Sequence, residues 1–494
     1  MNTIPLLREQ LRLGLEWRGI PPGDAGMTIR NPATGEPLGR VPTCSAGDVT
    51  EAIEAARTAL PGWRGTTAAR RAAALRRLAN LIRQNQPDLA RLLTLEQGKP
   101  LREAELEVGY GLAYVEWYAE EALRIYGETI PGPAPHRRTL VLREPIGVCA
   151  AITPWNFPLA TVARKMAPAL AAGCTFICKP APETPFSALA LAALAEEAGI
   201  PPGVVNVLTG DAALIAGVLM DSPVVRQVSF TGSTEVGQIL IRHSAETIKK
   251  LTLELGGNAP LIVFDDADVN AAVEGALFAK YRNAGQTCIG ANRLLLHESI
   301  APEFIPHFIE RSRALKVGSG LDPEVDLGPL ISPAASAKVR ELLQEALERG
   351  AHLALGDVPA EGSRFCSPVV VTGVSPSMRL WSEEIFGPVT PIVTFGDEAE
   401  AIRIANDTPY GLASYLYTRD LGRAFRATEA LEFGMVGVNS TAISDAHAPF
   451  GGIKKSGFGR EGGRAGIEEY LNLKYVSLDI GGESGAPPAG SRHP

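Results

Sequence analysis

The chain has 494 residues, of which 45% are hydrophobic and 21% are charged, an ordinary balance for a globular protein with material for roughly three domains. Its formal net charge of −8 gives no overall positive charge that would attract nucleic acid. The same negative charge repels an anionic substrate, which would therefore need local Arg or Lys side chains. The six cysteines form no C-x-x-C pair and the seven histidines no H-E-x-x-H, so we expect no metal site and a reducing compartment. The chain begins without the apolar core of a signal peptide, and no stretch approaches the ~20 apolar residues of a membrane span, so a soluble cytoplasmic enzyme is expected.

The first third of the chain is predicted to be mainly helical. Residues 28–41 indicate a strand and a turn, and Ser45 or Asp48 could cap the helix that follows. Helices are predicted over 49–60, 68–85, 89–96 and 103–126. We interpret their Arg and Glu side chains as solvent-facing. A Gly- and Pro-rich break then precedes a strand at 138–143 without an obvious neighbour in sequence, which makes it a candidate oligomerisation arm.

Strands and helices alternate in the rest of the chain. Strands are predicted at 146–152, 175–179, 204–208, 224–230, 251–255 and 261–264, with helices at 159–172, 183–198, 212–220 and 235–245. This rhythm predicts a mostly parallel sheet with helices on both faces, which would bind a nucleotide at the carboxyl ends of its strands. The alternation restarts at Asp265, as in a second α/β domain, and from about Gly481 the tail is predicted to be disordered.

Cys288 ends the polar segment Asn283-Ala284-Gly285-Gln286-Thr287-Cys288, between a predicted helix at 268–280 and a predicted strand at 293–297. A loop at such a junction is where a rigid scaffold presents catalytic side chains. The alternative is a buried structural cysteine.

Two turns of the first α/β unit suit a phosphate-bearing ligand. Gly232 and Ser233 follow a strand and open a helix, whose free N–H groups and dipole favour an anion, although an ordinary N-capped helix has the same pattern. Lys179 ends another strand on the carboxyl side, where it is either positioned for the ligand or merely solvated. The Gly457-Phe-Gly459-Arg-Glu-Gly462 segment matches G-x-G-x-x-G but lacks a βαβ context, so we interpret it as a mobile loop.

Glu254 and Asn156 are candidates for acid–base and oxyanion chemistry. Glu254 lies between leucines and before Gly256-Gly257, where burial would raise its pKa and suit it to general base work; it could instead be a charge on an edge strand. Asn156 belongs to the stiff turn Thr-Pro-Trp-Asn-Phe-Pro at 153–158, and its amide could either face an oxyanion or cap the turn.

Together these motifs resemble the aldehyde dehydrogenases from about Asn31 to Val476. The resemblance rests on the turn at 153–158, Phe-Thr-Gly-Ser-Thr-Glu-Val-Gly at 230–237, Leu-Glu-Leu-Gly-Gly-Asn at 253–258, Gly-Gln-Thr-Cys at 285–288 and Glu-Ile-Phe-Gly-Pro at 384–388. Within the family the chain is most similar to the succinate-semialdehyde dehydrogenases, through Thr-Leu-Glu-Gln-Gly-Lys-Pro at 94–100, Ala-Arg-Lys at 163–165, Arg-Asn-Ala-Gly-Gln-Thr-Cys at 282–288 and Ala-Pro-Phe-Gly-Gly at 448–452.

The resemblance implies an α/β fold with two Rossmann-like domains and a small β oligomerisation arm. Residues 1–124 and 145–256 would form the cofactor-binding domain, 257–455 the catalytic domain, 125–144 and 467–480 the arm, and 481–494 a disordered tail. It further implies a homo-oligomer, dimer or tetramer, joined through 138–143 and a strand near 470–476, with a place in 4-aminobutyrate degradation and with no nucleic-acid or membrane partner.

The resemblance also implies a role for each matching residue. Cys288 would be the nucleophile, Glu254 the base that activates water, and Asn156 with the Cys288 backbone N–H the oxyanion hole. The cofactor, NADP or NAD, would be bound by Trp155, Lys179, Gly232, Ser233, Gly237, Glu384 and Phe386. Within that set Lys179 would hold the adenosine ribose, Ser233 the pyrophosphate and Glu384 the nicotinamide ribose. Arg164, Arg282 and Ser444 would grip a substrate carboxylate, for which Arg is well suited.

Two positions depart from common family patterns. Pro182 stands where many NAD-preferring members have a Glu, so NADP should be tolerated and could be preferred. Gly290 stands where some semialdehyde dehydrogenases have a second cysteine, so their disulfide switch should be absent. The predicted reaction is oxidation of succinate semialdehyde to succinate through a hemithioacetal and a thioester on Cys288. The alternatives are glutarate semialdehyde or a broader ω-carboxy or aliphatic aldehyde, a cofactor-independent thiol esterase, and an inert structural relative.

Overall fold

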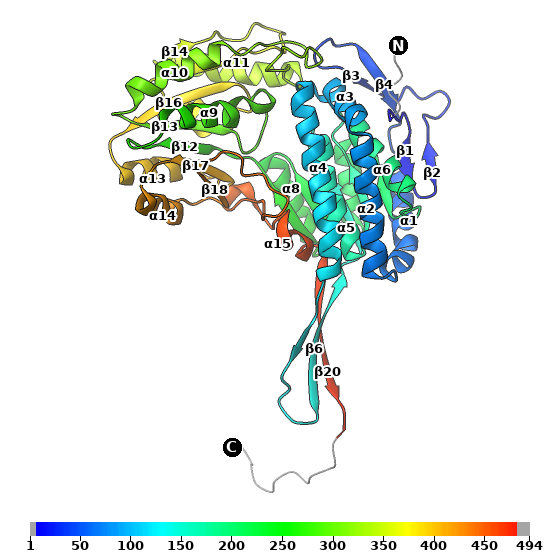
Figure 1. Cartoon of the computed structure of the whole chain (residues 1–494). Coiled ribbons are helices and arrows are strands. Elements are labelled where there is room, and N and C mark those ends of the chain that lie inside the picture. Colours follow the sequence, from blue (N-terminus) through cyan, green and yellow to red (C-terminus); the bar gives the residue numbers. More distant parts are fainter. Residues whose placement is uncertain (1–5, 482–494) are drawn as a thin grey trace.

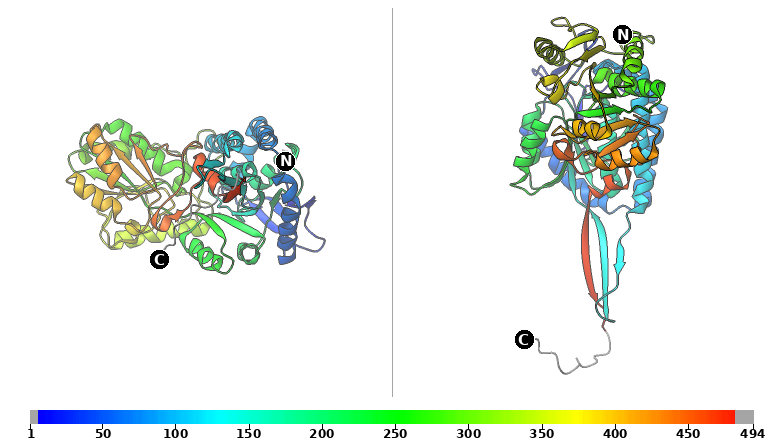
Figure 2. Two further views of the ribbon diagram at one scale, coloured as in Figure 1. Left: turned by 90° about the horizontal axis from the view of Figure 1, so that it is seen from below. Right: turned by 90° about the vertical axis from the view of Figure 1, so that its left-hand side faces the viewer.

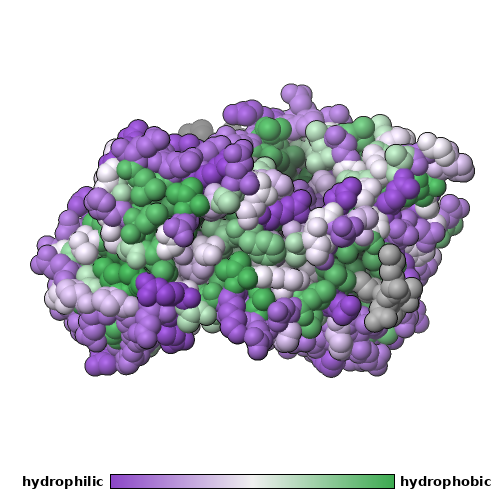
Figure 3. Space-filling model, turned by 90° about the horizontal axis from the view of Figure 1, so that it is seen from above, coloured by the Kyte–Doolittle hydropathy of each residue, from purple (hydrophilic) through white to green (hydrophobic). Residues whose placement is uncertain are grey.

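The structure, a computed structural model, describes residues 6–481 and consists of two α/β units and a projecting β arm (Figure 1). The predicted disordered tail therefore lies, except for Gly481, outside the described residues. The right-hand view of Figure 2 shows that the arm stands clear of both units. Seen from above, the molecule has a largely hydrophilic rim with hydrophobic patches towards its middle (Figure 3). No helix within residues 6–481 is long and apolar enough to cross a membrane.

The first unit is built on an eight-stranded sheet of order β19-β11-β10-β7-β8-β9-β1-β2. Its five parallel strands are β7 (Val148–Ile152), β8 (Thr175–Lys179), β9 (Val205–Val207), β10 (Val225–Thr231) and β11 (Lys250–Glu254). The antiparallel strands at its two edges are β1 (Leu11–Leu13), β2 (Glu16–Arg18) and β19 (Gly457–Phe458). All residues of β7 and β8 are buried, as expected for strands that are covered on both faces.

Helices pack on the faces of this sheet and form two separate hydrophobic cores with it. One core contains residues of α2 (Ala68–Gln84), α3 (Gln86–Gln97), α4 (Leu101–Glu121), α5 (Pro158–Ala172) and α6 (Phe186–Glu197). The other contains residues of α1 (Ala46–Arg64), α7 (Ala212–Asp221) and α8 (Thr234–Ser244). Ser45 is the N-cap of α1 and forms a capping box with Asp48, so both predicted capping residues take part.

The second unit is built on a seven-stranded sheet of order β14-β15-β16-β13-β12-β17-β18, parallel except for β14. Its strands are β12 (Ala259–Val263), β13 (Ala291–His297), β14 (His352–Leu355), β15 (Val369–Thr372), β16 (Val389–Phe395), β17 (Ala413–Tyr417) and β18 (Met435–Val438). Its helices are α9 (Val269–Tyr281), α10 (Ala301–Arg313), α11 (Pro333–Glu348), α12 (Arg379–Ser382), α13 (Glu398–Asn406) and α14 (Leu421–Ala430). The second predicted α/β domain is therefore present.

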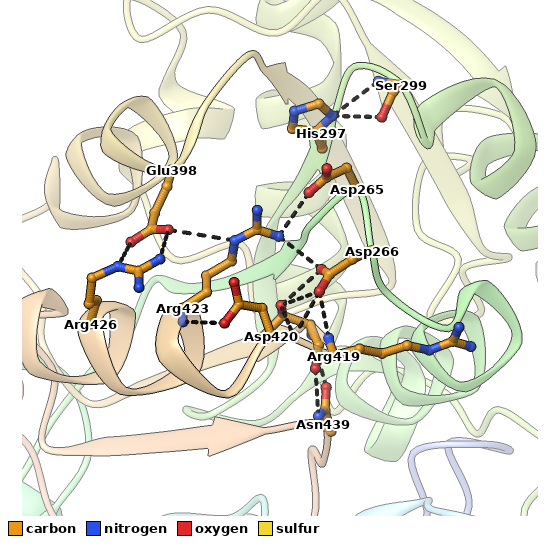
Figure 4. Close-up of polar contacts among 11 residues, drawn as sticks. Asp265, Asp266, His297, Ser299, Glu398, Arg419, Asp420, Arg423, Arg426 and Asn439 are labelled. Atoms are coloured by element: carbon orange, nitrogen blue, oxygen red, sulfur yellow. Dashed lines mark hydrogen bonds and ion pairs between the residues drawn. The ribbon is translucent and has the colours of Figure 1, made fainter.

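A charged network ties α14 to the loop after β12 (Figure 4). Asp266 accepts hydrogen bonds from the backbone N–H groups of Arg419 (2.9 Å) and Asp420 (2.8 Å), immediately before α14. Arg423 of α14 reaches back to Asp266 at 2.8 Å and pairs with Glu398 of α13 at 3.5 Å. These contacts satisfy backbone groups at the helix start that would otherwise lack partners.

The arm is a three-stranded antiparallel sheet in which β6 (Arg137–Pro145) lies between β20 (Leu471–Asp479) and β5 (Glu128–Ile130). The predicted strand at 138–143 thus pairs with two others. A separate hairpin joins β3 (Met27–Arg30) and β4 (Pro37–Val41), and α15 (Gly463–Glu468) leads into β20.

Two predictions about local structure are wrong. The Gly457–Gly462 segment is not simply a loop, because β19 pairs with β11 and a Cβ on Gly457 would lie 1.9 Å from the Leu253 carbonyl oxygen. The charged residues of the N-terminal helices do not all face solvent, because Glu96, Glu107 and Glu121 are buried. Helical periodicity identifies an apolar face, but it does not reveal a charged residue that is buried with a specific partner.

Candidate active site

Four predicted site residues lie at the carboxyl-terminal ends of parallel strands in the eight-stranded sheet. Asn156 follows β7, Lys179 ends β8, Ser233 follows β10 and Glu254 ends β11. Because these strands are parallel and hydrogen-bonded to one another, their carboxyl ends lie side by side.

Cys288 lies on the loop between α9 and β13, which approaches these strand ends from the second unit. The loop contains three consecutive residues in the left-handed backbone conformation, Asn283 (φ 53°), Ala284 (φ 53°) and Gly285 (φ 75°). For a non-glycine residue this conformation costs about 1–2 kcal/mol. Side-chain hydrogen bonds offset the cost, since Asn283 Nδ2 donates to the carbonyl oxygens of Asn156 (3.0 Å) and Gln286 (3.2 Å). The cysteine loop is thereby attached directly to the Asn156 turn.

The Cys288 thiol faces a narrow pocket that contains most of the predicted chemistry. The pocket is lined by Tyr110, Asn156, Phe157, Thr161, Arg164, Thr231, Arg282, Thr287, Cys288, Ile289, Ser444 and Phe450. Burial, with a contribution from the charge of Glu384, raises the pKa of Cys288 to about 12, while Arg164 opposes this shift. Burial therefore favours the neutral thiol over the thiolate in this pocket.

Glu254 is a buried carboxyl group at the end of β11. It is 1% exposed, and neither of its carboxylate oxygens has a hydrogen-bond partner among residues 6–481. Burial and the nearby charge of Glu461 raise its pKa well above the usual value, against the opposing effect of Arg164 and Lys165. A carboxyl group with a raised pKa and free oxygens is suited to take a proton from water.

Glu461 is a functional candidate that the sequence reasoning missed. It is 4% exposed, forms ion pairs with Arg164 and Lys165, and accepts a hydrogen bond from Ser229 Oγ at 3.2 Å. Burial alone would raise the pKa of Glu461, but the two cations outweigh this and lower it. It lies in the G-x-G-x-x-G segment, and the only sequence signal was a carboxylate within a glycine-rich stretch.

The two candidate substrate arginines differ in their surroundings. Arg164 is 6% exposed, is paired with Glu461, and its guanidinium lies 4.4 Å from the centroid of the Phe450 ring. Arg282 is half-buried, stacks 4.8 Å from the Phe157 ring centroid, and forms no ion pair within the described part of the chain. The structure brings both arginines, with Ser444, to the Cys288 pocket. Arg164 is already paired with Glu461, so the charge of Arg282 is the more available to a ligand.

A cavity of 720 Å³ continues outward from this pocket. It shares Tyr110, Phe157, Arg282 and Ser444 with the Cys288 pocket, so the two form one route to the thiol. Its other walls carry charges of both signs, including Arg102, Glu105, Glu274, Arg311 and Asp326.

The residues predicted to bind a dinucleotide fit such a ligand. Lys179 is 2% exposed, its pKa is lowered by burial, and its amine has no hydrogen-bond or ion-pair partner among residues 6–481. Ser233 is the N-cap of α8 and accepts from Val236 N at 3.3 Å. Gly237 lets α8 approach the sheet, because a Cβ there would lie 2.6 Å from Leu255. An unpartnered amine and a closely packed helix N-terminus, both at the carboxyl ends of the parallel strands, suit ribose and phosphate groups.

The remaining cofactor candidates come from both units. Trp155 and Phe386 meet edge to face with ring centroids 5.5 Å apart. Glu384 accepts a hydrogen bond from Gly257 N at 3.1 Å, and burial raises its pKa to about 7. Pro182 is half-buried and brings no charge, but the exposed neighbour Glu183 acts on the charge of Lys179. No group of three or more His, Cys, Asp or Glu residues that could hold a metal occurs between residues 6 and 481.

Comparisons with known proteins agree with this geometry. A profile of the Aldehyde dehydrogenase family matches residues 21–476. The chain is 52% identical to the NADP-dependent succinate-semialdehyde dehydrogenase of Escherichia coli, over 97% of this chain and 100% of that protein. It is 53% identical to a glutarate-semialdehyde dehydrogenase of Pseudomonas aeruginosa, over 97% and 99%. The crystal structure of a succinate-semialdehyde dehydrogenase from Burkholderia pseudomallei matches with a TM-score of 0.95 and 52% identity, over 97% and 100% of the two chains.

Proposed function

The chain belongs to the aldehyde dehydrogenase family, as its motifs predicted, and we propose that it oxidises succinate semialdehyde to succinate. Its cofactor is NADP or NAD, which accepts a hydride at the nicotinamide ring. The observation that carries the substrate proposal is that Arg164, Arg282 and Ser444 share one pocket with Cys288. Two guanidinium groups beside the nucleophile suit an aldehyde that carries a carboxylate.

Cys288 is the nucleophile of the proposed reaction. The neutral thiol first loses its proton to water in the route that opens to solvent. The resulting thiolate adds to the aldehyde carbon, and the carbonyl π electrons move to oxygen to give a hemithioacetal. The oxyanion is stabilised by the Cys288 backbone N–H and by the amide of Asn156. One N–H of that amide already donates to the Gln286 carbonyl at 3.1 Å, which leaves the other for the oxyanion. One such donor contributes about 3–4 kcal/mol to transition-state stabilisation.

Glu254 is the base of the second half of the reaction. After the hydride has left the hemithioacetal carbon, the acyl group remains on Cys288 as a thioester. The Glu254 carboxylate takes a proton from water as the water oxygen attacks the thioester carbon, and the Cys288 sulfur leaves. The free oxygens of Glu254 support this role, since they are available to bind the water.

The eight-stranded unit is the proposed cofactor-binding domain and the seven-stranded unit the proposed catalytic domain. Lys179 would hold the adenosine ribose, Ser233 the pyrophosphate and Glu384 the nicotinamide ribose. Gly232, Gly237, Trp155 and Phe386 would complete the site. Pro182 favours tolerance of the 2′-phosphate of NADP, although the carboxylate of Glu183 reduces that advantage.

A second candidate substrate is glutarate semialdehyde, which is one methylene longer. The route beyond the Cys288 pocket continues into the 720 Å³ cavity, so a longer ω-carboxylate has space. The related Pseudomonas aeruginosa protein is a glutarate-semialdehyde dehydrogenase. A cofactor-independent thiol esterase is disfavoured, because the buried amine of Lys179 would then have no ligand.

Steady-state assays test the proposal. Succinate semialdehyde, glutarate semialdehyde and butanal are each compared with NADP and with NAD. We expect kcat/KM for a carboxylated aldehyde to exceed that for butanal by at least about tenfold, the size of one charge-assisted hydrogen bond. Equal values for butanal would refute carboxylate recognition, and a higher value for glutarate semialdehyde would select the second candidate.

The arm is the proposed contact of a homo-oligomer in the cytoplasm. Its strand β20 is an edge strand with exposed Leu473 (67%) and Tyr475 (67%), and such an edge can pair with another chain. Leu473→Lys should therefore lower the molar mass measured by light scattering. An unchanged mass would exclude this edge as the contact. The product succinate is consistent with a place in 4-aminobutyrate degradation.

A further inference from the structure

A buried ion pair between Lys99 and Glu107 lies directly behind the catalytic turn. Lys99 Nζ and Glu107 Oε2 are 2.5 Å apart, and the two side chains are 1% and 0% exposed. Removing two charges from water is costly, and replacing such a pair by uncharged groups is often neutral for stability. Stability alone is therefore a weak explanation for this pair.

The contacts of the pair converge on the Asn156 turn. Lys99 Nζ also donates to the backbone carbonyl of Asn156 at 2.7 Å and lies 4.0 Å from the centroid of the Phe157 ring. The other oxygen of Glu107 accepts from Leu159 N (3.0 Å) and from the next backbone N–H (3.2 Å), at the start of α5. One ion pair thus holds the chain on both sides of Phe157 and Pro158, which limits rotation of the peptide that carries the Asn156 side chain.

The same carbonyl of Asn156 connects the turn to the Cys288 loop. It accepts its second hydrogen bond from Asn283 Nδ2, and Asn283 Oδ1 in turn accepts from Gln97 Nε2 at 3.0 Å. Gln97 and Lys99 are two positions apart in the segment at 94–100, so this segment contacts both halves of the oxyanion site. The distance between the Asn156 amide and the Cys288 backbone N–H therefore depends on these buried side chains.

We propose that Lys99 and Glu107 are positioning residues for the reaction, which hold the Asn156 amide where the oxyanion of the hemithioacetal forms. This inference rests on the role of Asn156 in the proposed function. Neither residue touches the reacting atoms. Both act through the backbone of the 156–160 segment, and a small displacement of an oxyanion donor has a large effect on rate.

Glu96 provides a matched control in the same segment. It is as fully buried as Glu107 and, like it, accepts backbone hydrogen bonds at a helix start, from Phe186 N (2.8 Å) and Ser187 N (2.9 Å) of α6. It makes no hydrogen bond to the Asn156 turn. Glu96→Gln is therefore expected to lower thermal stability while leaving kcat unchanged.

The test variant is Lys99→Met/Glu107→Gln, which removes both charges together and leaves no unpaired ion. We expect its unfolding midpoint to stay within about 5 °C of the wild type, since stability changes of one or two kcal/mol shift a protein of this size by a few degrees. The rate of the first-turnover burst of NAD(P)H should fall about 10- to 100-fold. The KM for the cofactor should change less than about twofold, because the cofactor site is not contacted.

The rate of Cys288 alkylation by iodoacetamide distinguishes a defect in the oxyanion site from a defect in the thiol. Alkylation forms no oxyanion on a carbonyl, so its rate should be equal in the wild type and the double variant. A double variant with a wild-type burst would overturn the proposal, and so would an alkylation rate that falls in parallel with the burst, because the defect would then lie in the thiol. A wild type that does not oxidise any aldehyde would instead refute the proposed function.

Asn283→Gly keeps the test decisive if the double variant does not fold. This variant removes the other hydrogen bond to the Asn156 carbonyl without leaving a buried charge, and glycine accepts the left-handed backbone at this position. We expect its burst rate to fall several-fold with an unchanged alkylation rate. A wild-type burst in Asn283→Gly would show that hydrogen bonds to the Asn156 carbonyl do not set the burst rate, and would overturn the proposal through that premise.

Discussion

Replacement of Arg282 by Met is expected to separate substrate recognition from catalysis. Arg282 is half-buried, stacks on Phe157 and Phe278, and has no ion-pair partner in the described chain, so its guanidinium is available to a substrate carboxylate. A hydrogen bond to a charged group contributes about 1.5–3 kcal/mol, and 1.36 kcal/mol corresponds to a tenfold change in rate. We therefore expect kcat/KM for succinate semialdehyde to fall about 10- to 150-fold, while kcat/KM for butanal changes less than about threefold.

The loss of stability in Arg282→Met should be small, because the two ring contacts contribute about 0.5–1 kcal/mol each at a partly exposed site. Arg164→Met is a poorer probe, since it leaves the buried Glu461 with one cation fewer, at a cost of about 3–5 kcal/mol. Arg311→Met is the matched control: Arg311 lines the same cavity but is paired with Glu274 and is nearly half exposed. Equal losses of kcat/KM for both aldehydes in Arg282→Met would refute the carboxylate-binding argument.

Three further outcomes are expected. Glu254→Gln should keep the burst of NAD(P)H and lower steady-state turnover about 10²- to 10⁴-fold in stopped-flow absorbance; if both phases are unchanged, Glu254 is not the deacylation base. Glu461→Gln removes a charge that raises the pKa of Glu254, so the acid limb of the kcat–pH profile should move to lower pH, and a limb that stays in place would show that this coupling is negligible. Asp266→Asn should lower the unfolding free energy by about 1 kcal/mol at pH 7, as for a lost helix cap. Because hydrogen bonds and Arg423 outweigh burial and lower the pKa of folded Asp266, this difference should be present above its unfolded pKa and vanish as the pH falls through the folded pKa, which denaturation at pH 7 and at acidic pH would detect.

The alternation of strands and helices could be predicted from the sequence because strands buried on both faces are continuous apolar runs. β8 was predicted to the residue, β7 nearly so, and the helix predicted from Asp268 has that residue as its N-cap. α1 begins at Ala46, before the predicted start at residue 49, although Ser45 was one of its two predicted caps. β19 could not be predicted, because two residues carry no periodicity and its partner β11 is separated from it by the entire second sheet.

The site was predictable where its chemistry depends on local sequence. Asn156 follows one recognisable strand and Lys179 ends the next, so the parallel topology alone brings both to the carboxyl ends of neighbouring strands. The ion pairs of Lys99 with Glu107 and of Arg164 with Glu461 were not predictable. Lys99 lies between α3 and α4 and pairs with Glu107 of α4, and Arg164 of α5 pairs with Glu461, which precedes α15. In sequence a buried Glu has the same appearance as a solvated one.

The late position of β19 in the chain has a consequence for biosynthesis. A polypeptide that emerges from the ribosome completes β7, β8, β10 and β11 early, but the edge of β11 stays uncovered until residues beyond 457 have been made. An unpaired edge is prone to pair with other chains, so the nascent protein carries this liability through synthesis of the whole second unit. Glu461 arrives only a few residues later, so a product that terminates before it would contain the nucleophile and the base yet lack a counterion for Arg164 and Lys165.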